Sequence, residues 1–171
     1  MIFILFKKKE APVQQEKQDD SDKPKLEWKE TYVAGLEHYE FKKYIKALID
    51  NDALLENDDY NLKKKDFIED IVEGERVYQY DEYQCDFNLI RDENNEYDAN
   101  AVKVVAVYRS EEFMLGYIPK NLTKQVMSSH ELRAIPSLRI VGGKYKVHDG
   151  EEIEKDKTDY SLRLEYAIEK R

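Results

Sequence analysis

The sequence predicts a mainly β fold with minor α content: a small β-barrel with two to three helices packed on it. Several segments alternate apolar and polar residues, as half-buried strands do, and turn-forming residues separate them. Two stretches with helical periodicity lie together after the first of these strands. This order favours a barrel over a parallel α/β sheet. A length of 171 residues favours one domain with enough chain to bury a core.

The first strand and two helices are expected between residues 31 and 74. Residues 31–36 are rich in β-branched and aromatic side chains and predict a strand, in which Gly35 indicates a bulge or a close backbone approach. Helical spacing of apolar residues follows, at Phe41, Tyr44, Ile45, Leu48 and Ile49. A second helix is expected to begin at Lys63–Lys65 and to stop at Gly74, with an apolar face made by Phe67, Ile68, Ile71 and Val72. The two helices form an insertion at about residues 40–74, and we expect both apolar faces to cover a sheet.

The centre of the chain predicts a strand, a polar turn and a second strand. Residues 87–89 and 102–104 alternate in polarity. Between them lie Asn94, Asn95 and residues 98–100, whose short amide and carboxylate side chains favour turns. The turn is unusual because it also carries a tyrosine.

The C-terminal third predicts four more strands and a helix. A strand over residues 113–118 is followed by a helix that begins near Pro119. Residues 138–141 and 145–147 predict two strands, with Gly142-Gly143 as the turn between them. A last strand alternates apolar residues, at Tyr160, Leu162, Leu164 and Tyr166.

Residues 1–30 are expected to form a disordered charged tail, and residues 31–171 the folded domain. The segment 7–29 is charged and rich in glutamine, with little apolar content. The apolar residues 1–6 are too few to span a membrane. The lysines follow them, whereas a signal peptide would place the lysines first. We therefore expect no membrane span.

Charge argues against bulk binding of a polyanion but leaves room for a local basic surface. The chain has 28 basic and 37 acidic side chains, a net charge of −9. Residues 37–86 hold 7 basic and 15 acidic groups, whereas residues 113–146 carry six cations against Glu131 alone. The single cysteine, Cys85, excludes an intramolecular disulfide and favours a cytoplasmic location.

The sequence offers no catalytic or metal-binding motif, so we expect neither an enzyme nor a small-molecule cofactor. It has no Gly-rich phosphate loop and no nucleophile elbow. The three histidines lie far apart without a matching carboxylate signature. Small barrels that hold single strands use aromatic faces and a few cations, and Tyr97, Tyr117 and Lys120 fit such a groove. The alternative is that both tyrosines pack under loops and that Lys120 is a solvated lysine.

Residues 91–104, followed by Leu115-Gly116-Tyr117-Ile118-Pro119, resemble the HIRAN domain. The family core carries Asn-x-Tyr-Asp-x-Asn-Ala and then Leu-Gly-aromatic, which this chain matches from Asn95 to Ala101 and at residues 115–117. Residues 33–36 are similar to the family's opening strand. The family occurs in helicases of fork repair and as short stand-alone bacterial proteins, which this chain resembles.

The resemblance implies an OB-like six-stranded barrel that captures the 3′ end of single-stranded DNA, in DNA repair or replication-fork processing. By matched position, Asp98 would accept the terminal 3′-hydroxyl and Tyr97 would stack on a base. Asn95 would shape the pocket, Tyr117 would line it, and Lys120 would meet a phosphate.

Two places depart from the family and leave a second function open. Where DNA-binding members carry an Arg-Tyr pair, this chain has Glu37 and His38, so His38 is the candidate contact there. The prolines expected in the turn are Glu93 and Glu96. Because a carboxylate repels phosphate, the alternative is a protein-interaction or regulatory module that keeps the fold but has lost DNA affinity.

Overall fold

The computed structural model describes residues 25–132 and 134–170. Its strands are β1 (Leu26–Tyr32), β2 (Val77–Tyr78), β3 (Tyr83–Gln84), β4 (Phe87–Arg91), β5 (Val102–Tyr108), β6 (Glu111–Tyr117), β7 (Ser137–His148) and β8 (Ile153–Glu169). Its helices are α1 (Phe41–Asp50), α2 (Lys64–Asp70), α3 (Thr123–Glu131) and the 3-10 helices η2 (Leu36–His38) and η3 (Asp58–Asn61). Most of the predicted tail lies outside the described residues, and β1 begins at Leu26, inside the segment assigned to that tail.

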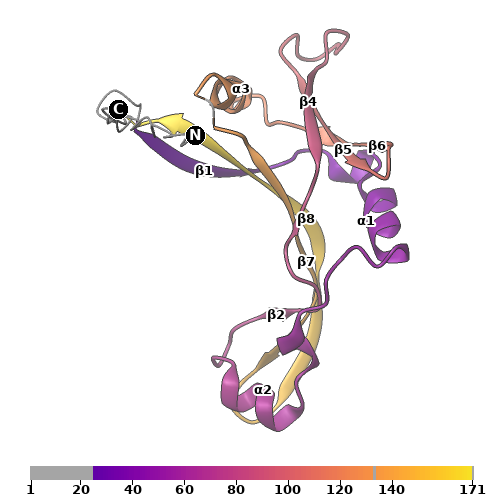
Figure 1. The fold of residues 1–171 in the computed structure, drawn as a ribbon, viewed down its shortest axis with the longest axis vertical. Helices are drawn as coiled ribbons and strands as arrows, with labels where there is room; N and C mark the ends of the chain where they lie inside the picture. Colours follow the sequence, from indigo (N-terminus) through magenta and orange to yellow (C-terminus); the bar gives the residue numbers. More distant parts are fainter. Residues whose placement is uncertain (1–24, 133, 171) are drawn as a thin grey trace, which may run out of the picture.

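The strands form two antiparallel sheets. One sheet has five strands in the order β1-β8-β7-β2, with β3 also pairing with β7, and the other has the order β4-β5-β6. Figure 1 shows β7 and β8 as a long hairpin, with the β4-β5-β6 sheet toward one end, α2 at the other end and α1 between them. The predicted mainly β class with three helices is confirmed.

The two sheets do not close into the predicted six-stranded barrel. They are linked where the chain passes from β3 into β4 and where Ala34, two residues after β1, pairs with Tyr117 at the end of β6. A closed barrel needs a continuous ladder around its circumference. Here β6 meets the edge of β1 only at this isolated bridge, so the ladder is interrupted.

The prediction of a turn at Gly142-Gly143 is wrong, because β7 runs through both glycines. Gly142 and Gly143 have φ angles of +93° and +98°, and the register with β8 shifts between Val141 and Gly143. A side chain at Gly142 would place its Cβ 2.5 Å from the carbonyl oxygen of Asp159. The two glycines therefore form a bulge that bends the hairpin. The real turn follows at residues 149–152.

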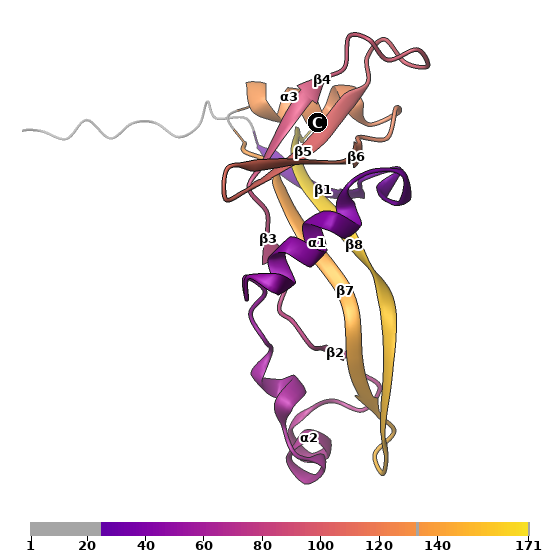
Figure 2. The ribbon, with the colours of Figure 1, turned by 90° about the vertical axis from the view of Figure 1, so that its right-hand side faces the viewer.

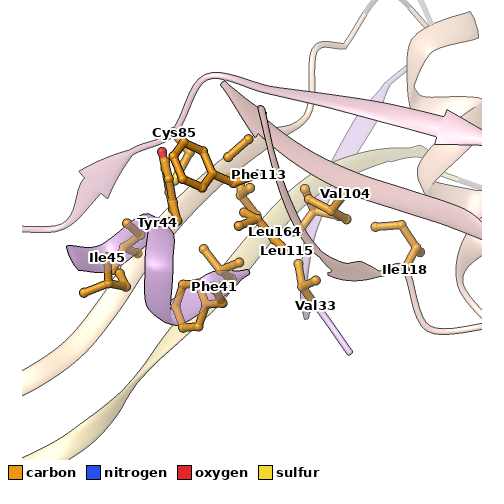
Figure 3. Close-up of a cluster of buried hydrophobic side chains, with 14 of the residues drawn as sticks. Val33, Phe41, Tyr44, Ile45, Cys85, Val104, Phe113, Leu115, Ile118 and Leu164 are labelled. Carbon is orange, nitrogen blue, oxygen red and sulfur yellow. The ribbon is translucent and has the colours of Figure 1, made fainter. Parts of the chain in front are cut away.

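The three predicted helices are present, and α1 builds the core. Figure 3 shows Phe41, Tyr44 and Ile45 of α1 beside Phe113 and Leu115 of β6. Four side chains of α1 are buried, namely Phe41, Tyr44, Ile45 and Leu48, whereas Ile49 is exposed. The apolar face predicted from the sequence therefore packs on the β4-β5-β6 sheet, apart from its last member.

The far end of the hairpin holds a smaller cluster of its own. Phe67 of α2 is fully buried and lies edge-on to His148, with 5.8 Å between ring centroids. His148 Nε2 lies 2.8 Å from the carbonyl oxygen of Ile71, which follows α2. Figure 2 shows α2 at the tip of the hairpin, away from α1. Within residues 25–132 and 134–170, no helix is long and apolar enough to cross a membrane.

Candidate nucleic-acid interface

The loop between β4 and β5, called here the 92–101 turn, is closed by backbone hydrogen bonds. The Asp92 N–H donates to the backbone carbonyl oxygen of Ala101 at 2.8 Å, and the Ala101 N–H donates to the backbone carbonyl oxygen of Asp98 at 2.9 Å. The Asn95 N–H donates to the backbone carbonyl oxygen of Asp92 at 3.1 Å. These bonds satisfy the backbone groups at the mouth of the turn and fix where its tip begins.

Asn95 orders the tip of the turn through its side chain. Its Oδ1 accepts the N–H groups of Tyr97 at 3.0 Å and Asp98 at 2.9 Å. Asp98 makes the same kind of side-chain-to-backbone hydrogen bond: its Oδ1 accepts the Asn100 N–H at 2.9 Å. Such side-chain-to-backbone bonds replace the backbone pairing of a regular turn. The structure thus brings Asn95, Tyr97 and Asp98 together in one pinned loop.

Asp92 anchors the base of the turn to the neighbouring strands. Its Oδ2 accepts a 2.7 Å hydrogen bond from the Tyr117 hydroxyl, and its Oδ1 lies 3.0 Å from the Lys103 Nζ. These two partners lower the pKa of Asp92 from its usual value, the Tyr117 hydrogen bond contributing most. Asp92 is buried, and each of its carboxylate oxygens already has a partner. It therefore stabilises the turn and is not available to bind a ligand.

Tyr117 is placed by the bridge between the two sheets. The N–H groups of Ala34 and Tyr117 donate to each other's carbonyl oxygens, at 2.8 and 2.9 Å. This approach requires Gly116, because a Cβ there would lie 2.3 Å from the Ala34 oxygen. Burial and the hydrogen bond to Asp92 raise the pKa of Tyr117 to about 12. Its hydroxyl therefore stays protonated and donating at neutral pH.

A groove runs beside Tyr117 along the edge of β6. Tyr39 packs edge-on against Tyr117, with 5.6 Å between ring centroids. The groove is lined by Tyr39, Glu40, Lys103, Val105, Glu112, Met114 and Tyr117. The Lys103 ammonium is already paired with Asp92, and Glu40 and Glu112 add negative charge. The groove therefore combines two aromatic rings with a weakly acidic wall.

The side chains of the remaining predicted residues are exposed and take no part in these hydrogen bonds. Tyr97 is 89% exposed at the tip of the turn. Lys120 is exposed before α3, and no carboxylate of the described chain pairs with it. His38 Nε2 lies 3.1 Å from the Glu37 carboxylate, with both side chains exposed. Glu37 lines a different groove, which also contains Tyr160 of β8, and not the groove beside Tyr117.

Sequence reasoning missed Asp92, Lys103 and Tyr39. Lys103 lies opposite Tyr117 in the β5–β6 register, so both side chains share a face. Alternation in β5 could have indicated this position, since Lys103 is the polar residue between two buried valines. No local pattern indicates that Asp92 is buried, because its partner Tyr117 lies 25 positions along the chain.

Comparison with known proteins gives one family. The model of the HIRAN domain matches residues 30–133, from the end of β1 through α3. Among curated proteins and solved structures, none matches this chain. Within the described residues no group of three or more histidine, cysteine, aspartate or glutamate side chains is placed to hold a metal ion. The match covers more than half of the sequence and includes the whole 92–101 turn and Tyr117, so the chain belongs to the HIRAN domain family.

Proposed function

We propose that this protein binds the 3′ end of single-stranded DNA through the 92–101 turn. Binding of single-stranded DNA ends is the activity for which HIRAN domains are known, and the family match includes this turn. The observation that carries the proposal is Tyr97, an aromatic ring 89% exposed on a loop that Asn95 holds in place. Because Asn95 already holds the backbone at Tyr97, only the exposed side chain has to be ordered when it stacks on a base.

Asp98 is the proposed acceptor of the terminal 3′-hydroxyl. Its backbone N–H is held by Asn95, and one carboxylate oxygen accepts the Asn100 N–H. No described residue donates to the other oxygen, Oδ2. A sugar hydroxyl can donate to that oxygen, whereas a 3′-phosphate has no such donor and carries like charge. Asp98 would therefore distinguish a 3′-hydroxyl end from a blocked end.

The other predicted residues have supporting roles in this proposal. Asn95 shapes the loop, Tyr117 lines the neighbouring groove, Lys120 meets a phosphate, and His38 offers a second stacking ring. Among the described residues, Lys103 is the one cation that lines the groove beside Tyr117, and it is already paired with Asp92. We therefore expect a shallow salt dependence, with the slope of one or two phosphate contacts at about 0.7 per contact. Capture of such ends would place the protein in DNA repair or replication-fork processing.

A titration by fluorescence anisotropy tests this proposal directly. Oligonucleotides with a 3′-hydroxyl or a 3′-phosphate are compared for the wild-type chain, Asp98→Asn and the control Asp81→Asn, which alters an exposed aspartate outside the turn. We expect the wild type and the control to prefer the 3′-hydroxyl end and Asp98→Asn to lose that preference. The proposal fails if neither oligonucleotide binds at low salt, or if Asp98→Asn keeps the preference.

The second candidate is a protein-interaction or regulatory module that retains the fold. Its support is the acidic surface: residues 37–86 carry 7 basic and 15 acidic groups, and Glu40 and Glu112 line the groove beside Tyr117. Such a surface favours a basic partner over a phosphate backbone. Clear 3′-end binding in the titration, together with a pull-down that recovers no stable partner, would count against this function.

A further inference from the structure

We propose that two copies of this chain pair through β1, antiparallel and two-fold symmetric about Trp28. This surface belongs to the five-stranded sheet and is separate from the proposed DNA site. β1 is the terminal strand of that sheet and has β8 on one side. Along residues 26–32, no other described strand pairs with it. An unprotected edge of this length is a template for another strand.

Hydrogen bonds in β8 show which backbone groups of β1 point to the open side. The Ala167 N–H donates to Ser129 Oγ at 3.0 Å, so it points away from β1 and from Trp28 opposite it. The Lys170 N–H donates to the Lys25 carbonyl oxygen at 2.7 Å, so the Lys25–Lys170 pair, three positions away, is hydrogen-bonded. Bonded and non-bonded pairs alternate in an antiparallel ladder. The outward-pointing N–H and C=O groups therefore belong to Leu26, Trp28, Glu30 and Tyr32.

The same edge is already used for pairing two residues further on. Ala34 continues the alternation, and its N–H and C=O are the groups that bond Tyr117 of β6 at 2.8 and 2.9 Å. The edge that runs from β1 to Ala34 therefore has the geometry to accept a strand. β6 hydrogen-bonds to it only at Ala34. An incoming strand can occupy residues 26–30 without displacing Tyr117.

Charge and the length of the overlap together select one register for pairing with a second copy. Residues that face each other across a two-fold axis lie on the same face, and like charges directly opposite are destabilising. An axis at Glu27, Lys29 or Glu30 would set that residue opposite itself. An axis at Trp28 instead sets Glu27 opposite Lys29 of the partner subunit, on both sides of the axis. An axis at Leu26 would also avoid like-charge pairs among the described residues, by setting Glu27 opposite Lys25 of the partner subunit, but it would leave Lys29 and Glu30 without a described residue opposite them. The centre at Trp28 both avoids like-charge pairs and pairs all of residues 26–30, the part of the edge left open by Tyr117.

The apolar side chains of β1 support the same centre. Leu26, Trp28 and Tyr32 are 37%, 50% and 62% exposed on one face of the strand. With the axis at Trp28, the two indoles lie side by side and cover each other. Large aromatic residues at the centre of an interface contribute most of its binding energy. Figure 1 shows β1 alongside β8, on the side of the hairpin away from α1.

Opposite charge reversals in the full-length protein test the proposal. Glu27 and Lys29 pair with each other within the chain and are both substantially exposed, so Glu27→Lys and Lys29→Glu should leave folding intact. We expect sedimentation velocity to show the wild type shifting to twice its monomer mass as concentration rises. Each single variant should lose this shift, because reversal sets like charges opposite each other. Mixing the two variants should restore it, since the two lysines of one chain then face two glutamates of the other.

A control variant and a folding measurement distinguish a specific effect on pairing from a general effect of charge or of unfolding. Glu151→Lys makes the same charge change in the β7–β8 turn and should dimerise like the wild type, and circular dichroism checks that every variant is folded. A wild type that stays monomeric at all concentrations overturns the proposal. So do single variants that still dimerise, which would indicate another surface, and an equimolar mixture that stays monomeric, which would exclude the register centred on Trp28.

Discussion

The hydroxyl of Tyr117 donates a 2.7 Å hydrogen bond to Oδ2 of Asp92, and this contact joins the two halves of the HIRAN motif. Asp92 opens the 92–101 turn, whereas Tyr117 ends β6 and pairs through its backbone with Ala34. The carboxylate also binds Lys103, so it connects the turn, β5 and β6. The loop proposed to meet DNA is therefore fixed to two strands of the β4-β5-β6 sheet through one buried side chain, and the backbone of Tyr117 links this sheet to Ala34.

Asp92→Asn should lower the melting temperature at neutral pH, and the loss should shrink on acidification. The folded state lowers the pKa of Asp92 below its ordinary value of 3.8 through Tyr117 and Lys103. A lowered pKa contributes stability that is present above the ordinary value and is lost as pH falls through the folded pKa. Thermal unfolding of both proteins from pH 7 to below pH 3.8 measures this. A difference in melting temperature that stays constant across this range would contradict the assigned pKa direction.

Tyr97→Ala should weaken binding of single-stranded DNA and leave stability unchanged. The ring is 89% exposed, so its removal should change the free energy of unfolding by less than about 0.5 kcal/mol. Loss of one stacked base should cost about 1–3 kcal/mol of binding free energy. Fluorescence anisotropy and chemical denaturation measure the two effects. Tyr32→Ala, which removes another exposed tyrosine, is the matched control and should bind DNA as the wild type does; equal losses for both would argue against a specific role for Tyr97.

The sequence predicted those parts of the fold whose signals are local. The spacing of Phe41, Tyr44, Ile45 and Leu48 gave α1 and its buried face, because helical periodicity is read within a few turns. The turn chemistry of Asn95 and Asp98 likewise predicted a loop in which these side chains bond the backbone. Gly142-Gly143 misled the prediction, because two glycines favour a turn and a bulge alike, and only pairing with β8 decides between them.

The site was harder to predict because its main contacts are distant in sequence. The pairings of Asp92 with Tyr117 and of Ala34 with Gly116-Tyr117 depend on how the two sheets meet. Resemblance to a family found the motif but not the role of Asp92 within it. The separation of Glu37 from the groove beside Tyr117 likewise follows from η2 and not from local residue types.

Cys85 should resist thiol reagents in the native state and react on unfolding. The thiol is 2% exposed, and burial raises its pKa to about 12, so almost no thiolate is present at neutral pH. Because it is the single cysteine of the chain, labelling with a disulfide reagent reports on this site alone. We expect slow labelling in buffer and rapid stoichiometric labelling in denaturant. Rapid labelling of the native protein would contradict the packing of Cys85 beneath α1.

Gly116→Ala should destabilise the protein far more than Gly74→Ala. A Cβ at Gly116 would lie 2.3 Å from the Ala34 oxygen and 2.9 Å from Val33 Cγ1, so it would force apart the bridge that joins the two sheets. Gly74 also has a positive φ, of +80°, but a Cβ there meets nothing within 4 Å. Its substitution should therefore cost about 1 kcal/mol of backbone strain, whereas Gly116→Ala should cost about 3 kcal/mol. Chemical denaturation measures both values. Equal losses for the two variants would mean that the close approach of Gly116 to Ala34 does not hold the sheets together; a larger loss for Gly116→Ala, accompanied by weaker DNA binding, would tie the placement of Tyr117 to that contact.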